Sequence, residues 1–125
     1  MSNDPGNRFE RKHRLLDAAQ YGHVFAKATR SRDRFFTVLC RRSSRDEARL
    51  GLAIAKKQCR HATGRNRIKR VIRESFRRNQ VLLSNLDIVV INQAAAAKAS
   101  NPDLFASLET HWRQCQKAKR KPRES

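Results

Sequence analysis

The chain has no apolar run long enough to cross a membrane, which takes roughly 18 residues or more. Residues 1–14 also lack the apolar segment of a secretory signal. Aromatic residues make up only 6% of the sequence, although 38% of it is hydrophobic, which suffices for the core of one modest domain. We therefore expect a compact protein in the cytoplasm, with no membrane partner.

Cysteine is scarce and unpatterned. Cys40, Cys59 and Cys115 are an odd number, far apart and without a CxxC pair, so we expect reduced thiols rather than a disulfide framework. Cys59 lies two residues before His61, and His111 lies four before Cys115, so either pair could supply half of a metal site. A structural zinc site needs four ligands, so a pair of candidates is weak support for one, and we predict no metal bound by the protein alone. We interpret the thiols as buried.

Acidic residues are few. Asp and Glu total 11 against 29 Lys and Arg, which gives a formal net charge of +18. Self-repulsion at this charge opposes compaction, and a polyanionic partner is the usual compensation. Arginine outnumbers lysine, and its planar guanidinium suits phosphate and stacks on bases. Because the carboxylates are scattered and no nucleophile or metal triad is visible, we expect a protein that binds a polyanion, with no catalytic residues and no small-molecule ligand.

Helix and strand patterns alternate along the first half of the chain. Asp17 is a good N-cap, and apolar residues at helical spacing follow it as far as Ala28, which predicts a short first helix. Phe35–Arg41 and Leu50–Ala55 are predicted strands, and the polar turn between them favours an antiparallel hairpin. We also consider a short strand near Lys27–Arg30.

The second half predicts a long helix, a strand and a last helix. Ala62–Asn79 has one apolar stripe at helical spacing, and Leu86–Asn92 has the continuous apolar run of a buried central strand. Asn101 is expected to cap the last helix, with Pro102 in its first turn. The order predicts an α+β fold in a single domain over residues 1–125, with three helices packed on a small sheet. Its core should span about residues 8–117, followed by a disordered basic tail at 118–125.

The predicted helix at 62–79 is densely basic. Its apolar stripe centres on Ile68, Ile72 and Ser75, so packing of the core turns the opposite side outward. Like charges four residues apart repel by a few tenths of a kcal/mol per pair, and Glu74 is the one acid present. This density of positive charge indicates that the helix binds a polyanion rather than presenting an ordinary solvated face. The outward side, which we call the ridge, comprises Asn66, Arg70, Arg73 and Arg77, flanked by Arg65 and Lys69 on one side and Arg67 and Arg78 on the other.

The loop before this helix extends the basic surface. Lys56 and Lys57 follow the end of a predicted strand, and the amides of the loop and helix start add to an anion-binding surface. Gly64 either lets the backbone approach a phosphate or merely eases the turn. The sequence alone leaves both interpretations of Gly64 open.

The sequence resembles the signature of the bacterial ribonuclease P protein subunit in three stretches: Gly51-Leu52-Ala53-Ile54-Ala55-Lys56-Lys57, Arg65-Asn66-Arg67-Ile68-Lys69-Arg70, and Arg73-Glu74. The resemblance covers about residues 8–117, from Arg14-Leu15 to the Trp112 helix. It implies an α/β sandwich with a small mixed sheet and a left-handed βαβ crossover, against the usual right-handed rule. It also implies one-to-one binding to a catalytic RNA subunit, which carries the active site and holds Mg²⁺, and a precursor tRNA substrate whose 5′ leader is removed.

The resemblance implies roles for individual residues as well. The arginine-asparagine-arginine motif at 65–67 implies contact with the RNA subunit and local organisation of metal. Tyr21 and Phe25 match aromatics that face a cleft for the leader, although helical aromatics are often core residues and that alternative stays open. Strand alternation lets Phe36 join them, since stacking on single-stranded bases suits such a cleft. The predicted RNA-binding residues are Lys56, Lys57, Arg60, Arg65, Asn66, Arg67, Lys69, Arg70, Arg73 and Arg77, and the predicted leader-cleft residues are Tyr21, Phe25, Phe36, Lys69 and Arg73.

Two other functions fit the composition. A ribosomal-type RNA-binding structural protein is compatible with the size and charge of the chain, and the signature is the argument against it. A protein-only nuclease would need clustered acidic residues, which the sequence does not show. Assistance of precursor tRNA cleavage by a catalytic RNA is therefore the favoured hypothesis.

Overall fold

A computed structural model describes Gly22, Val24 and residues 28–120 of the chain. Its strands are β1 (Thr29–Arg32), β2 (Phe36–Arg42), β3 (Arg49–Ala53) and β4 (Leu86–Asn92). Its helical elements are α2 (Ala62–Arg78), the 3-10 helix η3 (Ala94–Lys98) and α3 (Asn101–Arg120). No helix in this part of the chain combines the length and the apolar character needed to cross a membrane.

The four strands form one mixed sheet in the order β1-β2-β4-β3. β2 pairs antiparallel with both β1 and β4, whereas β3 pairs in parallel with β4. The predicted hairpin between the second and third strands is therefore wrong, because β4, with five buried residues in succession, lies between them. The parallel pair joined by α2 is the βαβ unit that the resemblance implied, and the hand of its crossover stays a prediction.

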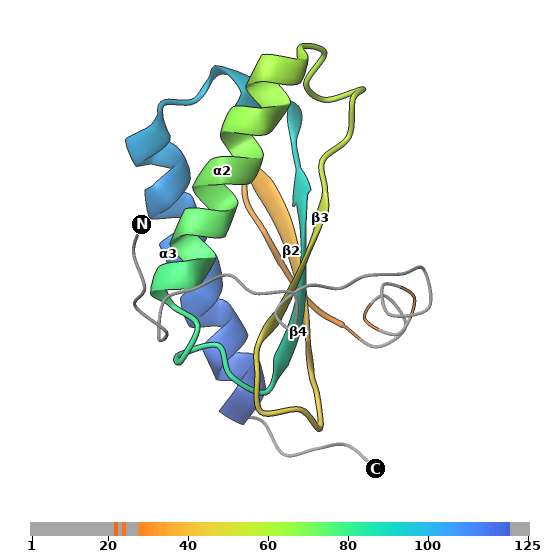
Figure 1. Ribbon diagram of the computed structural model, residues 1–125, viewed down its shortest axis with the longest axis vertical. Coiled ribbons are helices and arrows are strands. Elements are labelled where there is room, and N and C mark those ends of the chain that lie inside the picture. The colour runs from red at the N-terminus through yellow and green to blue at the C-terminus, as the bar shows by residue number, and fades with distance from the viewer. Residues whose placement is uncertain (1–21, 23, 25–27, 121–125) are drawn as a thin grey trace, which may run out of the picture.

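Both long helices pack on the same face of the sheet (Figure 1). Alternate strand residues point at them, including Val38, Ile88 and Val90, and all three are fully buried. The apolar stripe predicted for α2 is confirmed, since Ile68 and Ile72 are fully buried against this face. α3 contributes the buried residues Leu104, Leu108, Trp112 and Cys115 to the same core.

The prediction of three helices is wrong. In the residues that the structure describes, α2 and α3 are the long helices, and Ala94–Lys98 adds the short 3-10 helix that the sequence did not predict. η3 closes with i+3 bonds, since the amides of Ala96 and Ala99 donate to Gln93 O and Ala96 O. Apart from Gly22, Val24 and Ala28, the predicted first helix at 17–28 lies outside the described residues.

The N-cap of α3 is Ser100, one residue earlier than the predicted Asn101. The amide of Asp103 donates to Ser100 Oγ at 3.3 Å, and the amide of Leu104 donates to Ser100 O at 3.0 Å. Ser100 is therefore the capping residue, because a hydroxyl can satisfy an amide that the helix leaves free. Asn101 lies inside the helix, and its side chain accepts a hydrogen bond from α2 instead.

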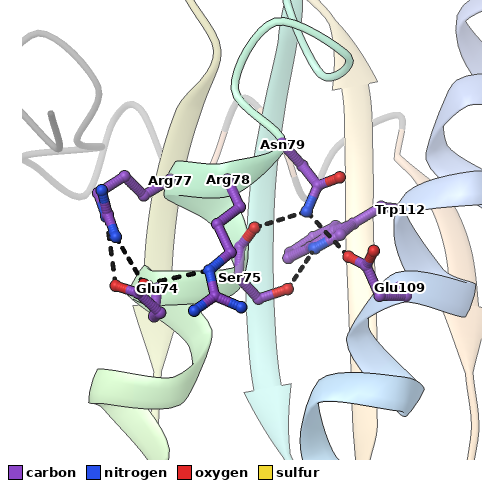
Figure 2. Close-up of polar contacts among 7 residues, drawn as sticks. All are labelled: Glu74, Ser75, Arg77, Arg78, Asn79, Glu109 and Trp112. Carbon is purple, nitrogen blue, oxygen red and sulfur yellow. Dashed lines mark hydrogen bonds and ion pairs between the residues drawn. The ribbon is translucent and has the colours of Figure 1, made fainter. Parts of the chain in front are cut away.

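The end of α2 is joined to α3 by one buried and one exposed polar contact (Figure 2). Trp112 Nε1 donates to Ser75 Oγ at 2.8 Å, which explains how a serine sits in an apolar stripe: its buried hydroxyl has a partner. Asn79 Nδ2 donates to Ser75 O at 2.7 Å and to Glu109 Oε2 at 2.8 Å. These contacts fix the orientation of α2 about its own axis, and therefore the direction in which its basic side faces.

The other face of the sheet carries a smaller apolar cluster and a buried ion pair. Leu39 and Val89 are buried there together with Val24. Arg49 binds Asp87 through two parallel hydrogen bonds of 2.8 and 2.7 Å, and the Asp87 side chain is 1% exposed. A carboxylate this deeply buried is stable because the guanidinium neutralises it in bidentate geometry.

Candidate nucleic-acid interface

The ridge of α2 points away from the core, as the helical pattern predicted. Asn66, Arg70 and Arg73 are exposed, while Arg77 is half-buried. Together with Glu74 they line a hollow of about 350 Å³ on the outside of the helix. Neither Arg70 nor Arg73 has an ion-pair partner in the described part of the chain, so both positive charges are available to a ligand.

The far end of the ridge is partly neutralised by Glu74. Arg77 Nε donates to Glu74 Oε2 at 3.2 Å, and Arg78 Nε donates to Glu74 Oε1 at 3.1 Å. The hydrogen bond from Arg77 lowers the pKa of Glu74, and the charges of Arg77 and Arg78 reinforce the effect against its partial burial. The positive charge without an acidic partner in the described residues therefore lies near the middle of α2, at Arg70 and Arg73 of the ridge and at Lys69 beside it.

Arg65 turns inward to hold the loop that precedes α2. Its Nη1 donates to Cys59 O at 3.0 Å and to Arg60 O at 2.8 Å. The loop itself is compact, because the amide of Cys59 donates to both Ala55 O and Lys56 O. Arg65 therefore shapes the loop that displays Lys56, Lys57 and Arg60, all three of which are exposed.

Arg67 holds the segment between β4 and α3. Its Nη1 donates to Asn101 Oδ1 at 2.8 Å, and its Nη2 donates to Ala97 O at 3.2 Å and, more weakly, to Ala96 O at 3.5 Å. The guanidinium thus ties α2 to η3 and to the first turn of α3. The sequence did not predict these inward contacts of Arg65 and Arg67, although their place on the flanks of the helical wheel, beside the core, was the signal for them.

Gly64 packs against a thiol, which neither interpretation from the sequence anticipated. A Cβ at this position would lie 2.9 Å from Cys59 Sγ, closer than side chains tolerate. Cys59 is buried, so the glycine lets the loop lie flat on the first turn of α2.

At the other end of the same loop, the amide of Ala55 donates to the buried Asn92 Oδ1 at 2.8 Å and fixes the exit from β3.

The predicted leader-cleft residues are only partly placed. Phe36 must be corrected: it is fully buried on the helix-covered face, where its ring meets His111 edge-on with centroids 6.4 Å apart. Because a buried ring cannot stack on a base, we leave Phe36 out of the interface. Tyr21 and Phe25 lie outside the described residues. Lys69 is half-buried and Arg73 exposed on α2.

A polar clamp connects the edge strand β1 to α3. Ser31 Oγ lies 2.7 Å from His111 Nδ1, and Ser107 Oγ donates to Asp33 Oδ2. His111 Nε2 lies 3.2 Å from the same carboxylate oxygen, although the alignment is too poor for a hydrogen bond. Burial acts to raise the pKa of Asp33, but the hydrogen bonds from Ser107 and the amides of Phe36 and Phe35, with the charge of His111, lower it overall. Since His111 is 1% exposed, we interpret this Ser-His-Asp arrangement as structural.

The three cysteines are free and buried. Cys40 and Cys115 belong to the same core cluster, and interaction with Cys40 together with burial raises the pKa of the Cys115 thiol. The described residues contain no group of three or more His, Cys, Asp or Glu side chains that could hold a metal ion.

The chain matches the family model described as Ribonuclease P over residues 9–116. It belongs to the bacterial ribonuclease P protein family. The ribonuclease P protein component of Methylococcus capsulatus is 45% identical over 107 residues, which cover 86% of this chain and 84% of that protein. The ribonuclease P proteins of Staphylococcus aureus and Thermotoga maritima have similar structures, with TM-scores of 0.75 and 0.72 at 28% identity. The match spans 87% of this chain and 93% of the Staphylococcus chain, and 81% and 96% for Thermotoga.

Membership in the ribonuclease P protein family decides between the functions considered above. The chain is the RNA-binding protein subunit of ribonuclease P, an endoribonuclease of tRNA processing, and it acts within a ribonucleoprotein with ribonuclease P RNA and precursor tRNA. The ribosomal-type alternative is not favoured.

Proposed function

We propose that the ridge and the loop before α2 form the surface that binds the catalytic RNA, one protein to one RNA, while the cleavage chemistry stays with the RNA. The observation that carries this proposal is a set of outward cations with no ion-pair partner in the described residues: Arg70 and Arg73 on the ridge, and Lys56, Lys57 and Arg60 on the loop before α2. A guanidinium without a protein partner loses none of its own contacts when a phosphate binds to it.

The inward arginines support the same surface from below. Arg65 fixes the loop through two backbone carbonyls, and Arg67 ties α2 to α3. Binding by residues whose backbone is already in place costs less conformational entropy than binding by a mobile loop. In this proposal Arg65 and Arg67 are positioning residues, whereas Asn66, Arg70 and Arg73 contact RNA.

We assign the 5′ leader of precursor tRNA to the side of α2 that carries Lys69 and Arg73. Lys69 is a half-buried cation with no partner in the described residues, next to the ridge. A leader is single-stranded, so an adjacent cationic groove suits its backbone. Mg²⁺ is assigned mainly to the RNA, since the described residues do not gather a set of acidic or imidazole ligands.

The test is reconstitution of the full chain with a bacterial ribonuclease P RNA at low Mg²⁺. The chain should increase cleavage of precursor tRNA, and Arg70→Ala/Arg73→Ala should remove most of that increase. Arg113→Ala/Lys117→Ala is the matched control, because both are exposed basic residues on α3 and lie outside the ridge. No gain in cleavage from the unmodified chain, or equal losses in ridge and control variants, would contradict the proposal.

A phosphate-dominated interface also predicts steep salt dependence. If about six phosphates are contacted, affinity for the RNA should fall about 10³-fold between 50 and 200 mM salt. A flat response would show that contacts other than phosphate ion pairs dominate.

A further inference from the structure

The edge strand β1 carries two arginines on the face of the sheet opposite α2 and α3. Arg30 is paired in register with Leu39, and Arg32 with Thr37. Cross-strand partners point to the same face, and Leu39 belongs to the apolar cluster on the face opposite the helices. Arg30 and Arg32 therefore both lie on that face, at its edge.

The polar clamp fixes this orientation. Ser31, between the two arginines, points to the helix side, where its hydroxyl meets His111 of α3 at 2.7 Å. Successive strand residues alternate between faces, so holding Ser31 against α3 holds Arg30 and Arg32 on the opposite side. The same alternation places them about 6.6 Å apart along the strand, from a rise of about 3.3 Å per residue.

Both arginines are exposed and, within the described residues, neither has a hydrogen-bond or ion-pair partner. The nearest acid in sequence, Asp33, is turned toward α3 and held by Ser107. The carboxylate on their own face, Asp87, is already neutralised by Arg49. The described residues of the protein therefore supply no anion for these two cations.

We infer that the β1 edge, through Arg30 and Arg32, binds a second stretch of RNA backbone, separate from the RNA on the ridge. β1 lies at the edge of the sheet opposite β3, from which the chain passes into α2, and its arginines face away from α2 and α3. The width of the sheet therefore separates them from the ridge. The inference rests on the proposed function, since it assigns a second contact to the same RNA partners.

Another explanation of the same arginines is protection of the edge. Charged residues on an edge strand keep it from pairing with the edge of another molecule. Glutamate at both positions would keep that protection but remove the attraction to phosphate. Arg30→Glu/Arg32→Glu therefore separates the two explanations, and Arg113→Glu/Lys117→Glu on the exposed side of α3 matches its change in net charge.

The experiment measures binding of each full-length variant to a bacterial ribonuclease P RNA transcript across a salt series. It then measures binding of precursor tRNA, with and without a leader, to the reconstituted holoenzyme. Losing two phosphate contacts should make the slope of log affinity against log salt shallower by about 1.4–1.8. The affinity of the β1 variant at low salt should fall about tenfold further than that of the α3 control. A loss with the RNA transcript assigns the contact to the catalytic RNA, and a loss confined to leader-bearing substrate assigns it to the leader.

Equal effects of the β1 and α3 variants in every arm would overturn the inference. Arg70→Glu/Arg73→Glu distinguishes this failure from failure of the proposed function: if that variant still loses RNA affinity, the ridge assignment stands and only the β1 contact is refuted. Should the double glutamate variant fail to fold by circular dichroism, Arg30→Gln/Arg32→Gln gives the same comparison against Arg113→Gln/Lys117→Gln.

Discussion

Replacing Arg67 should damage the fold, whereas replacing its neighbour Arg70 should damage only RNA binding. Arg67→Ala removes two good hydrogen bonds, to Asn101 Oδ1 at 2.8 Å and Ala97 O at 3.2 Å, and one marginal bond to Ala96 O. A hydrogen bond from a charged group contributes about 1.5–3 kcal/mol when buried. Because water can reach the acceptors at this half-exposed site, we expect a loss of about 2 kcal/mol in the free energy of unfolding for the whole set.

A loss of that size lowers the melting temperature by roughly 6–10 °C in a domain of this length. Urea and thermal unfolding followed by circular dichroism measure it directly. Arg70→Ala is the matched control, since Arg70 is exposed and has no partner in the described residues. Its unfolding free energy should stay within about 0.5 kcal/mol of the unmodified chain, while the salt slope of RNA binding should fall by about 0.7–0.9.

A free energy of unfolding for Arg67→Ala within about 0.5 kcal/mol of the parent value, roughly the scatter of ordinary surface substitutions, would contradict a structural role for Arg67. The contrast between the two arginines is equally refuted if Arg70→Ala is as destabilised as Arg67→Ala, because the guanidinium of Arg70 then has a structural partner. Arg67→Lys should recover only part of the stability, since an ammonium cannot reproduce the planar fork that reaches two acceptors at once.

Three further results are expected. Lys69→Ala should reduce holoenzyme affinity for leader-bearing precursor tRNA more than for leaderless tRNA; equal losses for both would contradict the leader assignment. The pKa of Asp33 is lowered from 3.8 by folding, so its stabilisation is complete above that pH and lost as the pH falls through the folded value. Asp33→Asn should therefore be less stable at neutral pH and show a flatter decline in urea stability between pH 5 and 2; parallel curves would exclude this role. Titration with a thiol-specific disulfide reagent should find no fast-reacting group in the native protein and three after unfolding, because burial protects Cys40, Cys59 and Cys115.

Local periodicity predicted the elements that carry the site. The helix at 62–79, the strand at 86–92 and the apolar face of the last helix all follow from spacing within one segment, and all are confirmed. The outward direction of Arg70 and Arg73 followed from the same stripe, because a helix that buries Ile68 and Ile72 must expose the opposite side. The exposure of these two arginines could therefore be predicted from the sequence alone.

Features that depend on contacts between distant segments could not be predicted. The partner of each strand depends on which strand takes the centre of the sheet, and β4 separated the two strands that the polar turn seemed to join. The inward bonds of Arg65 and Arg67 have carbonyl acceptors whose positions exist only after folding. Phe36 was misassigned because alternation says that neighbours face opposite sides, but not which side the helices cover.

Trp112 is the sole tryptophan of the chain, and it lies at the junction of α2 and α3 with 1% of its surface exposed. Its indole nitrogen is bound to Ser75, so its emission spectrum depends on whether that junction stays closed. The protein thus contains an intrinsic fluorophore in α3 that packs against the inner side of α2, the helix whose outer side carries the ridge. If RNA binding shifts α2, the emission maximum of Trp112 should move with it, and the movement can be followed in a stopped-flow instrument without any label.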